Sequence, residues 1–191
     1  MANSKLIVVE GAQGAGKTTV TDYLRHSIKY TNLYRLSGTA DSTKSGLKKA
    51  EEMYVDLLEY IKKLENKSIN LLFDRTFFTE ENYCRLGKKE YSFTEVYNNL
   101  LEEFSKLDFD IYYITLYLED TSLYEKRLSR DGKAILEYAK FTAENSIKQQ
   151  EEYLKMADEI KSKYPMINVY NIANDKDIEE VKAKLKEILA F

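Results

Sequence analysis

The chain has 191 residues, of which 32% are charged and 43% hydrophobic, a composition typical of one soluble globular domain. Its 29 basic and 32 acidic side chains give a net charge of −3, which argues against a dedicated binder of nucleic acid or membrane surfaces. One cysteine and one histidine exclude an internal disulfide and a Cys/His metal cluster. The first apolar run ends at Glu10, so it resembles neither a signal peptide nor a membrane span, and we expect a cytoplasmic protein.

Short β-rich runs alternate along the chain with longer stretches of helical period. The pattern predicts strands at residues 6–10, 32–36, 69–73, 111–118 and 167–170. It predicts helices after the first two strands, near residues 94–104, over 121–130 and about 135–163, and from 178 onward. Strands that are apolar on both faces and separated by helices are typical of a parallel sheet covered on both sides. The sequence therefore predicts a single α/β domain spanning residues 1–191.

The most specific motif is GAQGAGKT, which starts at Gly11 and matches G-x-x-x-x-G-K-[ST] at every fixed position. Glycines let backbone N–H groups converge on phosphate oxygens, and the following helix adds its positive N-terminal end. A lysine supplies charge to the β and γ phosphates, and a hydroxyl reaches Mg²⁺. The motif predicts a P-loop NTPase fold, a three-layer sandwich with a five-stranded parallel sheet. The residues expected to bind ATP are Gly11, Gln13, Gly14, Ala15, Gly16, Lys17, Thr18 and Thr19, with Thr18 also at the metal.

The surrounding sequence separates a transferase from a GTPase-like switch. A switch commonly needs D-x-x-G and N-K-x-D segments. The third strand instead ends in FDRTFF, and the nearest N-K sequence reads NKSI. Asp74 ends that strand at the carboxyl edge of the sheet, where ligands bind, so it is expected beside the metal. Arg75 would then face whatever receives the phosphoryl group.

GAQGAGKTT and DRTFFTEENY together resemble the thymidylate kinase family of nucleoside monophosphate kinases, whose members carry D-R-x-x-x-[ST]-x-x-x-[YF]. Thr79 and Tyr83 fall on the last two places of that pattern. The resemblance implies an Mg²⁺- and ATP-dependent kinase in which both residues lie at the acceptor site. It also implies a lid over residues 127–140, from which Arg127, Arg130 or both contact the transferred phosphoryl group. Related deoxynucleoside kinases are similar, with an [ED]-R-S segment.

The loop after the second strand bears on the acceptor. A nucleoside kinase attacks with a neutral hydroxyl and benefits from a carboxylate base near that strand, whereas a monophosphate needs cations. The sequence YRLSGTADSTK offers Arg35 and Lys44 against Asp41 alone, which favours a monophosphate gripped by Arg35 and Arg75. A nucleoside kinase, a kinase of polynucleotide ends or modified bases, and a non-catalytic nucleotide-binding module remain as alternatives. The partner expected is a small nucleotide or nucleoside rather than a membrane or polynucleotide, and a homodimer through exposed helices is compatible with the fold.

Overall fold

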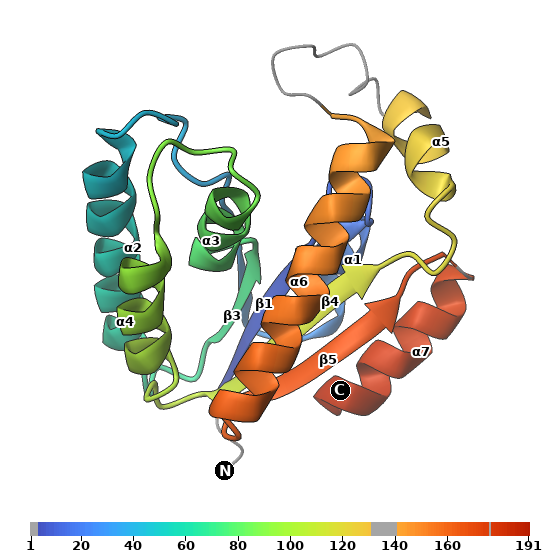
Figure 1. Cartoon of the computed structure of the whole chain (residues 1–191). Helices are drawn as coiled ribbons and strands as arrows, with labels where there is room; N and C mark the ends of the chain where they lie inside the picture. Colours follow the sequence, from blue (N-terminus) through green and yellow to red (C-terminus); the bar gives the residue numbers. More distant parts are fainter. Residues whose placement is uncertain (1–3, 131–140, 176) are drawn as a thin grey trace.

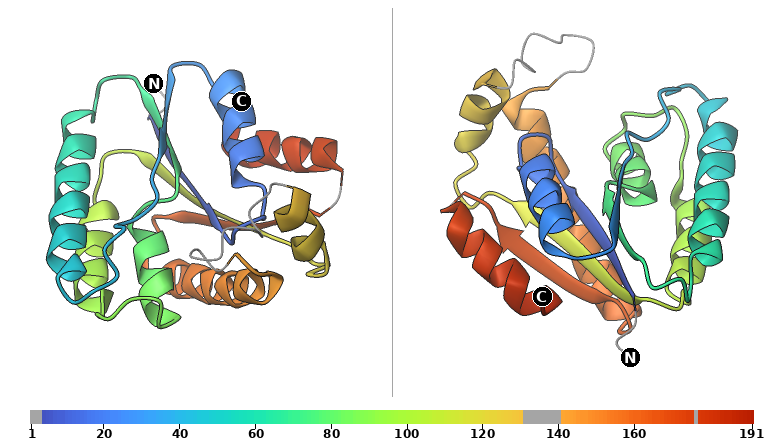
Figure 2. Two further views of the ribbon diagram at one scale, coloured as in Figure 1. Left: turned by 90° about the horizontal axis from the view of Figure 1, so that it is seen from above. Right: turned by 180° about the vertical axis from the view of Figure 1, so that it is seen from behind.

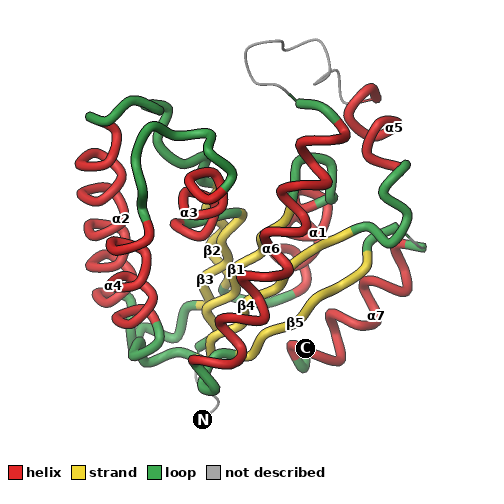
Figure 3. Tube along the Cα trace, in the orientation of Figure 1, coloured by secondary structure: helices red, strands yellow, loops and turns green. Residues whose placement is uncertain are grey.

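The computed structural model describes residues 4–130, 141–175 and 177–191. Its centre is a five-stranded sheet in the order β2-β3-β1-β4-β5, and every neighbouring pair is parallel (Figures 1 and 3). The strands are β1 (Lys5–Gly11), β2 (Thr31–Arg35), β3 (Asn70–Asp74), β4 (Asp110–Tyr117) and β5 (Asn168–Ala173). All five predicted strands are present, and their bounds differ from the prediction by three residues at most.

Helices cover both faces of this sheet (Figure 2). They are α1 (Lys17–Ser27), α2 (Gly46–Lys63), α3 (Phe77–Arg85), α4 (Thr94–Phe104), α5 (Leu123–Arg130), α6 (Ala143–Lys163) and α7 (Ile178–Leu189). In β1, Leu6 and Val8 pack in the cluster that includes α2, α3, α4 and α6, while Ile7 and Val9 pack with α1 and α7. Successive side chains of a strand point to opposite faces, so β1 is buried on both. The predicted three-layer α/β sandwich is confirmed.

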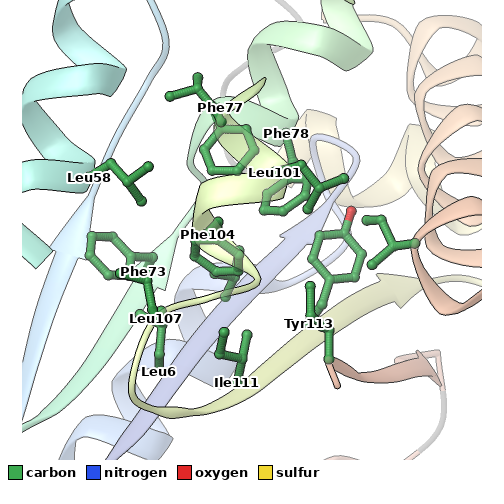
Figure 4. Close-up of a cluster of buried hydrophobic side chains, with 14 of the residues drawn as sticks. Leu6, Leu58, Phe73, Phe77, Phe78, Leu101, Phe104, Leu107, Ile111 and Tyr113 are labelled. Carbon is green, nitrogen blue, oxygen red and sulfur yellow. The ribbon is translucent and has the colours of Figure 1, made fainter. Parts of the chain in front are cut away.

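An aromatic cluster joins α3 to the sheet and to α4 (Figure 4). The Phe77 and Phe78 rings stack with centroids 4.3 Å apart, and Phe78 lies 4.6 Å from the ring of Tyr113 on β4. Phe104 of α4 closes the cluster at 5.7 Å from Phe77. Full burial of one such side chain stabilises the fold by about 1.5–3 kcal/mol. These contacts hold the start of α3, which follows the Asp74-Arg75 pair after the single residue Thr76.

Helix α3 itself is not among the predicted elements. In the folded protein the polar residues Thr79, Glu80 and Asn82 of this helix are as buried as Phe77 and Phe78. Its buried positions are therefore not all apolar, and the sequence shows no apolar stripe. A helix buried all round loses the amphipathic period on which sequence prediction depends.

The start of α6 also differs from the prediction. The helix begins at Ala143, where Thr142 accepts a hydrogen bond from the Asn145 N–H and caps the first turn. The predicted start near residue 135 lies outside the described residues. None of the described helices is long and apolar enough to span a membrane.

Candidate phosphate-binding cleft

The glycine loop connects β1 to α1 at the carboxyl end of the central strand. Gly14 and Gly16 have φ angles of +85° and +92°, in the left-handed region that L side chains rarely adopt. Lys17 begins α1, and its Nζ donates to the carbonyl oxygens of Gly11 and Ala12, both at 2.8 Å. The ammonium is therefore held against the loop, and its side chain is buried.

A cleft of about 980 Å³ opens beside this loop. The described residues that line it include Gln13, Gly14, Gly16, Lys17, Thr18, Thr19, Arg35, Asp74, Arg75, Arg127, Arg130 and Asn174. Five of these side chains are basic and Asp74 alone is acidic, a balance that attracts polyphosphates. The structure thus brings most of the predicted nucleotide, metal and arginine residues into one cleft, while Gly11 and Ala15 are buried and are not among its lining residues.

Asp74 and Arg35 lie on neighbouring strands and contact each other. Arg35 Nε is 3.6 Å from Asp74 Oδ2, and Arg35 Nη2 is 2.6 Å from Oδ1 of Asp22 on α1. The two residues are register partners in β2 and β3, so their side chains point to the same face of the sheet. Arg35 was expected to grip the acceptor. In this structure it lines the cleft and is paired with Asp22 of α1 and Asp74 of β3, and its role at the acceptor stays a prediction.

Arg75 has an unusual backbone for an arginine. Its φ is +72°, a left-handed conformation that costs about 1–2 kcal/mol for a residue with a side chain. Its N–H donates to the Val9 carbonyl at 3.2 Å, which secures the turn between β3 and α3. Burial by itself lowers the pKa of the Arg75 guanidinium, but acidic groups that include Tyr83 and Asp74 outweigh it and raise the pKa above its ordinary value. Arg75 is therefore a permanent cation in the cleft.

Glu10 is a site residue that the sequence analysis did not single out. It is the penultimate residue of β1, is fully buried, and accepts hydrogen bonds from the Thr76 N–H at 2.8 Å and the Thr79 hydroxyl at 2.7 Å. Burial raises the pKa of the Glu10 carboxyl to about 7, against the opposing effect of these hydrogen bonds and of Lys17 and Arg75. The available signal was a glutamate closing an otherwise apolar strand. Glu10 thus ties the segment that carries Asp74 and Arg75 to the glycine loop.

We expect Glu10 to make stability depend on pH. Because its folded-state pKa, about 7, lies above its ordinary value of 4.5, the folded protein holds the proton more tightly than the unfolded chain. Its contribution to the free energy of unfolding is therefore full below pH 4.5 and is lost as the pH rises through about 7. Urea unfolding without nucleotide should show wild type losing stability relative to Glu10→Gln across this window. The exposed control Glu90→Gln should stay parallel to wild type. Parallel curves for Glu10→Gln and wild type would disprove the effect.

Thr79 and Tyr83 do not line the cleft. Thr79 is fully buried, and besides binding Glu10 its hydroxyl lies 3.0 Å from the Tyr153 hydroxyl. Tyr83 is half-buried, and Lys88 Nζ lies 5.1 Å from the centre of its ring. In this structure Thr79 is therefore linked to the glycine loop through Glu10, and the roles of Thr79 and Tyr83 at the acceptor stay predictions.

A second buried carboxylate fastens the loop after β2. Glu80 of α3 is fully buried, accepts from the Thr39 N–H at 3.0 Å and from the Tyr91 hydroxyl, and pairs with Lys89 at 3.3 Å. Lys89 also donates to the Thr39 carbonyl at 2.6 Å. Removing one partner of a buried ion pair is strongly destabilising, so this cluster holds the loop that was predicted to face the acceptor.

Arg127 and Arg130 of α5 line the cleft, and Arg127 binds backbone carbonyl groups. Its Nη1 donates to the Gly14 carbonyl at 3.1 Å, and its Nη2 donates to the Asn174 carbonyl at 2.6 Å. The first part of the predicted lid is therefore docked on the glycine loop. The rest of the predicted lid, residues 131–140, lies outside the described residues.

The donor set suits Mg²⁺ bound together with a nucleotide. Among the described residues no group of three or more His, Cys, Asp or Glu side chains could hold a metal by itself. Among the described residues that line the cleft, Asp74 is the one carboxylate, and Thr18, next to Lys17 in the sequence, offers a hydroxyl. Mg²⁺ is commonly bound by one or two carboxylates plus substrate phosphates and water, so these two residues fit that role.

A glycine loop between the central strand and its helix, with a carboxylate on the neighbouring strand, defines a P-loop nucleotide-binding fold. No protein-family model matches the chain, and no curated protein matches it in sequence.

Solved structures do resemble it. Thymidylate kinase from Candida albicans is 18% identical with a TM-score of 0.65, covering 100% of this chain and 92% of that one. Thymidylate kinase from Ehrlichia chaffeensis is 17% identical with a TM-score of 0.60, covering 98% and 99%. Deoxyadenosine kinase from M. mycoides is 16% identical with a TM-score of 0.57, covering 97% and 100%. The chain therefore has a P-loop kinase fold that resembles thymidylate kinase, as the sequence predicts.

Proposed function

We propose that this protein transfers the γ-phosphoryl group of ATP to a nucleoside monophosphate. The observation that carries the proposal is the cleft, in which a complete phosphate-binding loop faces Asp74 and arginines from three different elements. The resemblance to thymidylate and deoxyadenosine kinase structures supports a kinase of small nucleotides or nucleosides.

In this reaction an acceptor phosphate oxygen bonds to the γ-phosphorus, the bond to the β–γ bridging oxygen breaks, and ADP leaves. Positioning and positive charge provide most of the catalysis. Lys17 and the loop N–H groups would hold the triphosphate, and Arg75 would orient the acceptor. Arg127 and Arg130 would offset charge on the transferred group. Thr18 and Asp74 would hold Mg²⁺, which neutralises phosphate charge when bound.

The acceptor class follows from the charges. A nucleoside acceptor would need a carboxylate to take its hydroxyl proton. Among the described residues that line the cleft, Asp74 is the only carboxylate, and it is paired with Arg35. Glu10 and Glu80 are buried and engaged by their own donors. This balance favours an acceptor that is already ionised. A homodimer and a cytoplasmic location remain predictions.

A panel of acceptors tests the proposal. Purified protein is incubated with ATP and Mg²⁺ together with nucleosides, nucleoside monophosphates or oligonucleotides, and phosphorylated products and ADP are quantified. We expect monophosphates to be phosphorylated far faster than the other two classes. Faster reaction with free nucleosides would replace the proposal with a nucleoside kinase, and nucleotide binding without any transfer would indicate a non-catalytic module.

A further inference from the structure

Three successive carbonyl groups of the glycine loop each accept a hydrogen bond from a side chain of another element. The donors are Ser146 Oγ of α6 to Gln13 O at 2.9 Å, Arg127 Nη1 of α5 to Gly14 O at 3.1 Å, and Asn174 Nδ2, after β5, to Ala15 O at 2.7 Å. We call these three side chains the loop brace. Segments more than a hundred residues away in sequence thus fasten the part of the loop between its first and last glycines.

The brace determines where the loop N–H groups point. A peptide unit is planar and trans, so the N–H of the following residue points away from the held carbonyl. The bonds to Gln13 O and Ala15 O therefore direct the N–H groups of Gly14 and Gly16 away from Ser146 and Asn174. The Ala15 N–H is used within the loop, donating to Ala12 O at 3.1 Å. Gly14 and Gly16 line the cleft, so their N–H groups form an anion cradle whose orientation the brace sets.

Asn174 is the most constrained member of the brace. It is buried, its own N–H donates to the Tyr117 carbonyl at 2.8 Å, and its carbonyl accepts from Arg127 at 2.6 Å. A Cβ atom on Gly16 would lie 2.2 Å from Asn174 Nδ2, so the amide lies against the glycine backbone. Asn174 directly follows β5, and its N–H is bonded to the end of β4. A residue placed in this way holds the glycine loop more rigidly than a residue on a free loop would.

From this geometry we propose that Asn174 is a positioning residue for the triphosphate, acting through the carbonyl of Ala15 on the N–H of Gly16. This inference deepens the proposed function, and of that function it requires only that a nucleoside triphosphate binds at the glycine loop. Without the amide donor, the Ala15 peptide is free to rotate and the cradle loses part of its preorganisation. Loss of the Asn174 amide therefore weakens the binding of ATP and leaves the binding of the acceptor unchanged.

The test uses full-length protein carrying Asn174→Asp, Asn174→Ala or Asn171→Ala. The Asp variant keeps the shape but replaces the donor with a carboxylate facing a carbonyl oxygen. The matched control Asn171 lies on β5 and is exposed. Calorimetric titration with Mg²⁺–ATP requires no acceptor, so the result stands whether or not the acceptor is correct. We expect Kd for ATP to rise at least about tenfold in both Asn174 variants, as for loss of a buried hydrogen bond, and to stay unchanged in Asn171→Ala.

Two further experiments distinguish a positioning role of Asn174 from a general loss of structure. One measures steady-state kinetics, and the other uses a variant of Ser146, a second member of the loop brace. With an active acceptor, KM for ATP should rise while KM for the acceptor stays within about twofold, the range of a uniform binding effect at a remote site. If the Asn174 variants unfold, Ser146→Ala, which frees the Gln13 carbonyl, should still weaken ATP binding severalfold. An ATP affinity equal to that of wild type in a folded Asn174 variant would overturn the inference. If both Asn174 variants unfold, a wild-type ATP affinity in folded Ser146→Ala would overturn it.

Discussion

Lys17→Ala is expected to lower kcat by about a thousandfold, the scale seen when one preorganised charge at a reacting group is removed. The Lys17 ammonium is held by the carbonyls of Gly11 and Ala12, where the proposed function requires the triphosphate charge to be neutralised. Initial rates with ATP and the best acceptor measure the effect. The fold should survive, because the Nζ hydrogen bonds to Gly11 and Ala12 lie within the loop and alanine is a strong helix former.

Two further variants sharpen this measurement. Lys17→Arg keeps the charge but replaces a compact ammonium with a planar guanidinium, and should recover only part of the activity. Lys29→Ala removes an exposed lysine beyond the other end of α1 and should behave as wild type. Near-wild-type turnover in folded Lys17→Ala would refute the assignment of this loop to ATP.

Asp74→Asn is expected to lower kcat by about a hundredfold or more and to shift the Mg²⁺ dependence to higher concentration. Asparagine keeps the shape of the side chain but removes the negative charge that a hard cation prefers, and charge stabilisation by the metal contributes several kcal/mol. Rates measured across a Mg²⁺ series, with ATP saturating, test this.

Asp22→Asn is the matched control for that experiment. Asp22 is the other carboxylate bound to Arg35, at 2.6 Å, but it is half-exposed on α1 and is not among the residues lining the cleft. We expect its Mg²⁺ dependence to follow wild type. An equal loss in both variants would show that orientation of Arg35, rather than metal binding, explains the role of Asp74.

Much of the fold was predictable because its signals are local. The runs at residues 6–10 and 111–118 are apolar at most successive positions, a pattern typical of a strand covered on both faces. The glycine loop was equally predictable, since the φ angles near +90° at Gly14 and Gly16 demand glycine, and glycine is visible in sequence. Predicting Asp74 in the cleft needed only the rule that parallel strands end at the same edge of the sheet.

Helix α3 and the buried carboxylates could not be predicted in the same way. Glu10 and Glu80 would each read as surface residues from their charge. Their burial depends on donors far away in the chain, at Thr76 and Thr79 for Glu10 and at Thr39 for Glu80.

The sequence alone therefore determined the layered sheet, the phosphate loop and the presence of Asp74 at its side, since each depends on neighbouring residues or on strand order. Only the tertiary structure decided what the side chains of Arg35 and Arg127 contact. Arg35 pairs with Asp22 and Asp74, and Arg127 binds the carbonyls of Gly14 and Asn174. A long cationic side chain can reach several partners, and which of them it meets depends on how distant segments pack in three dimensions.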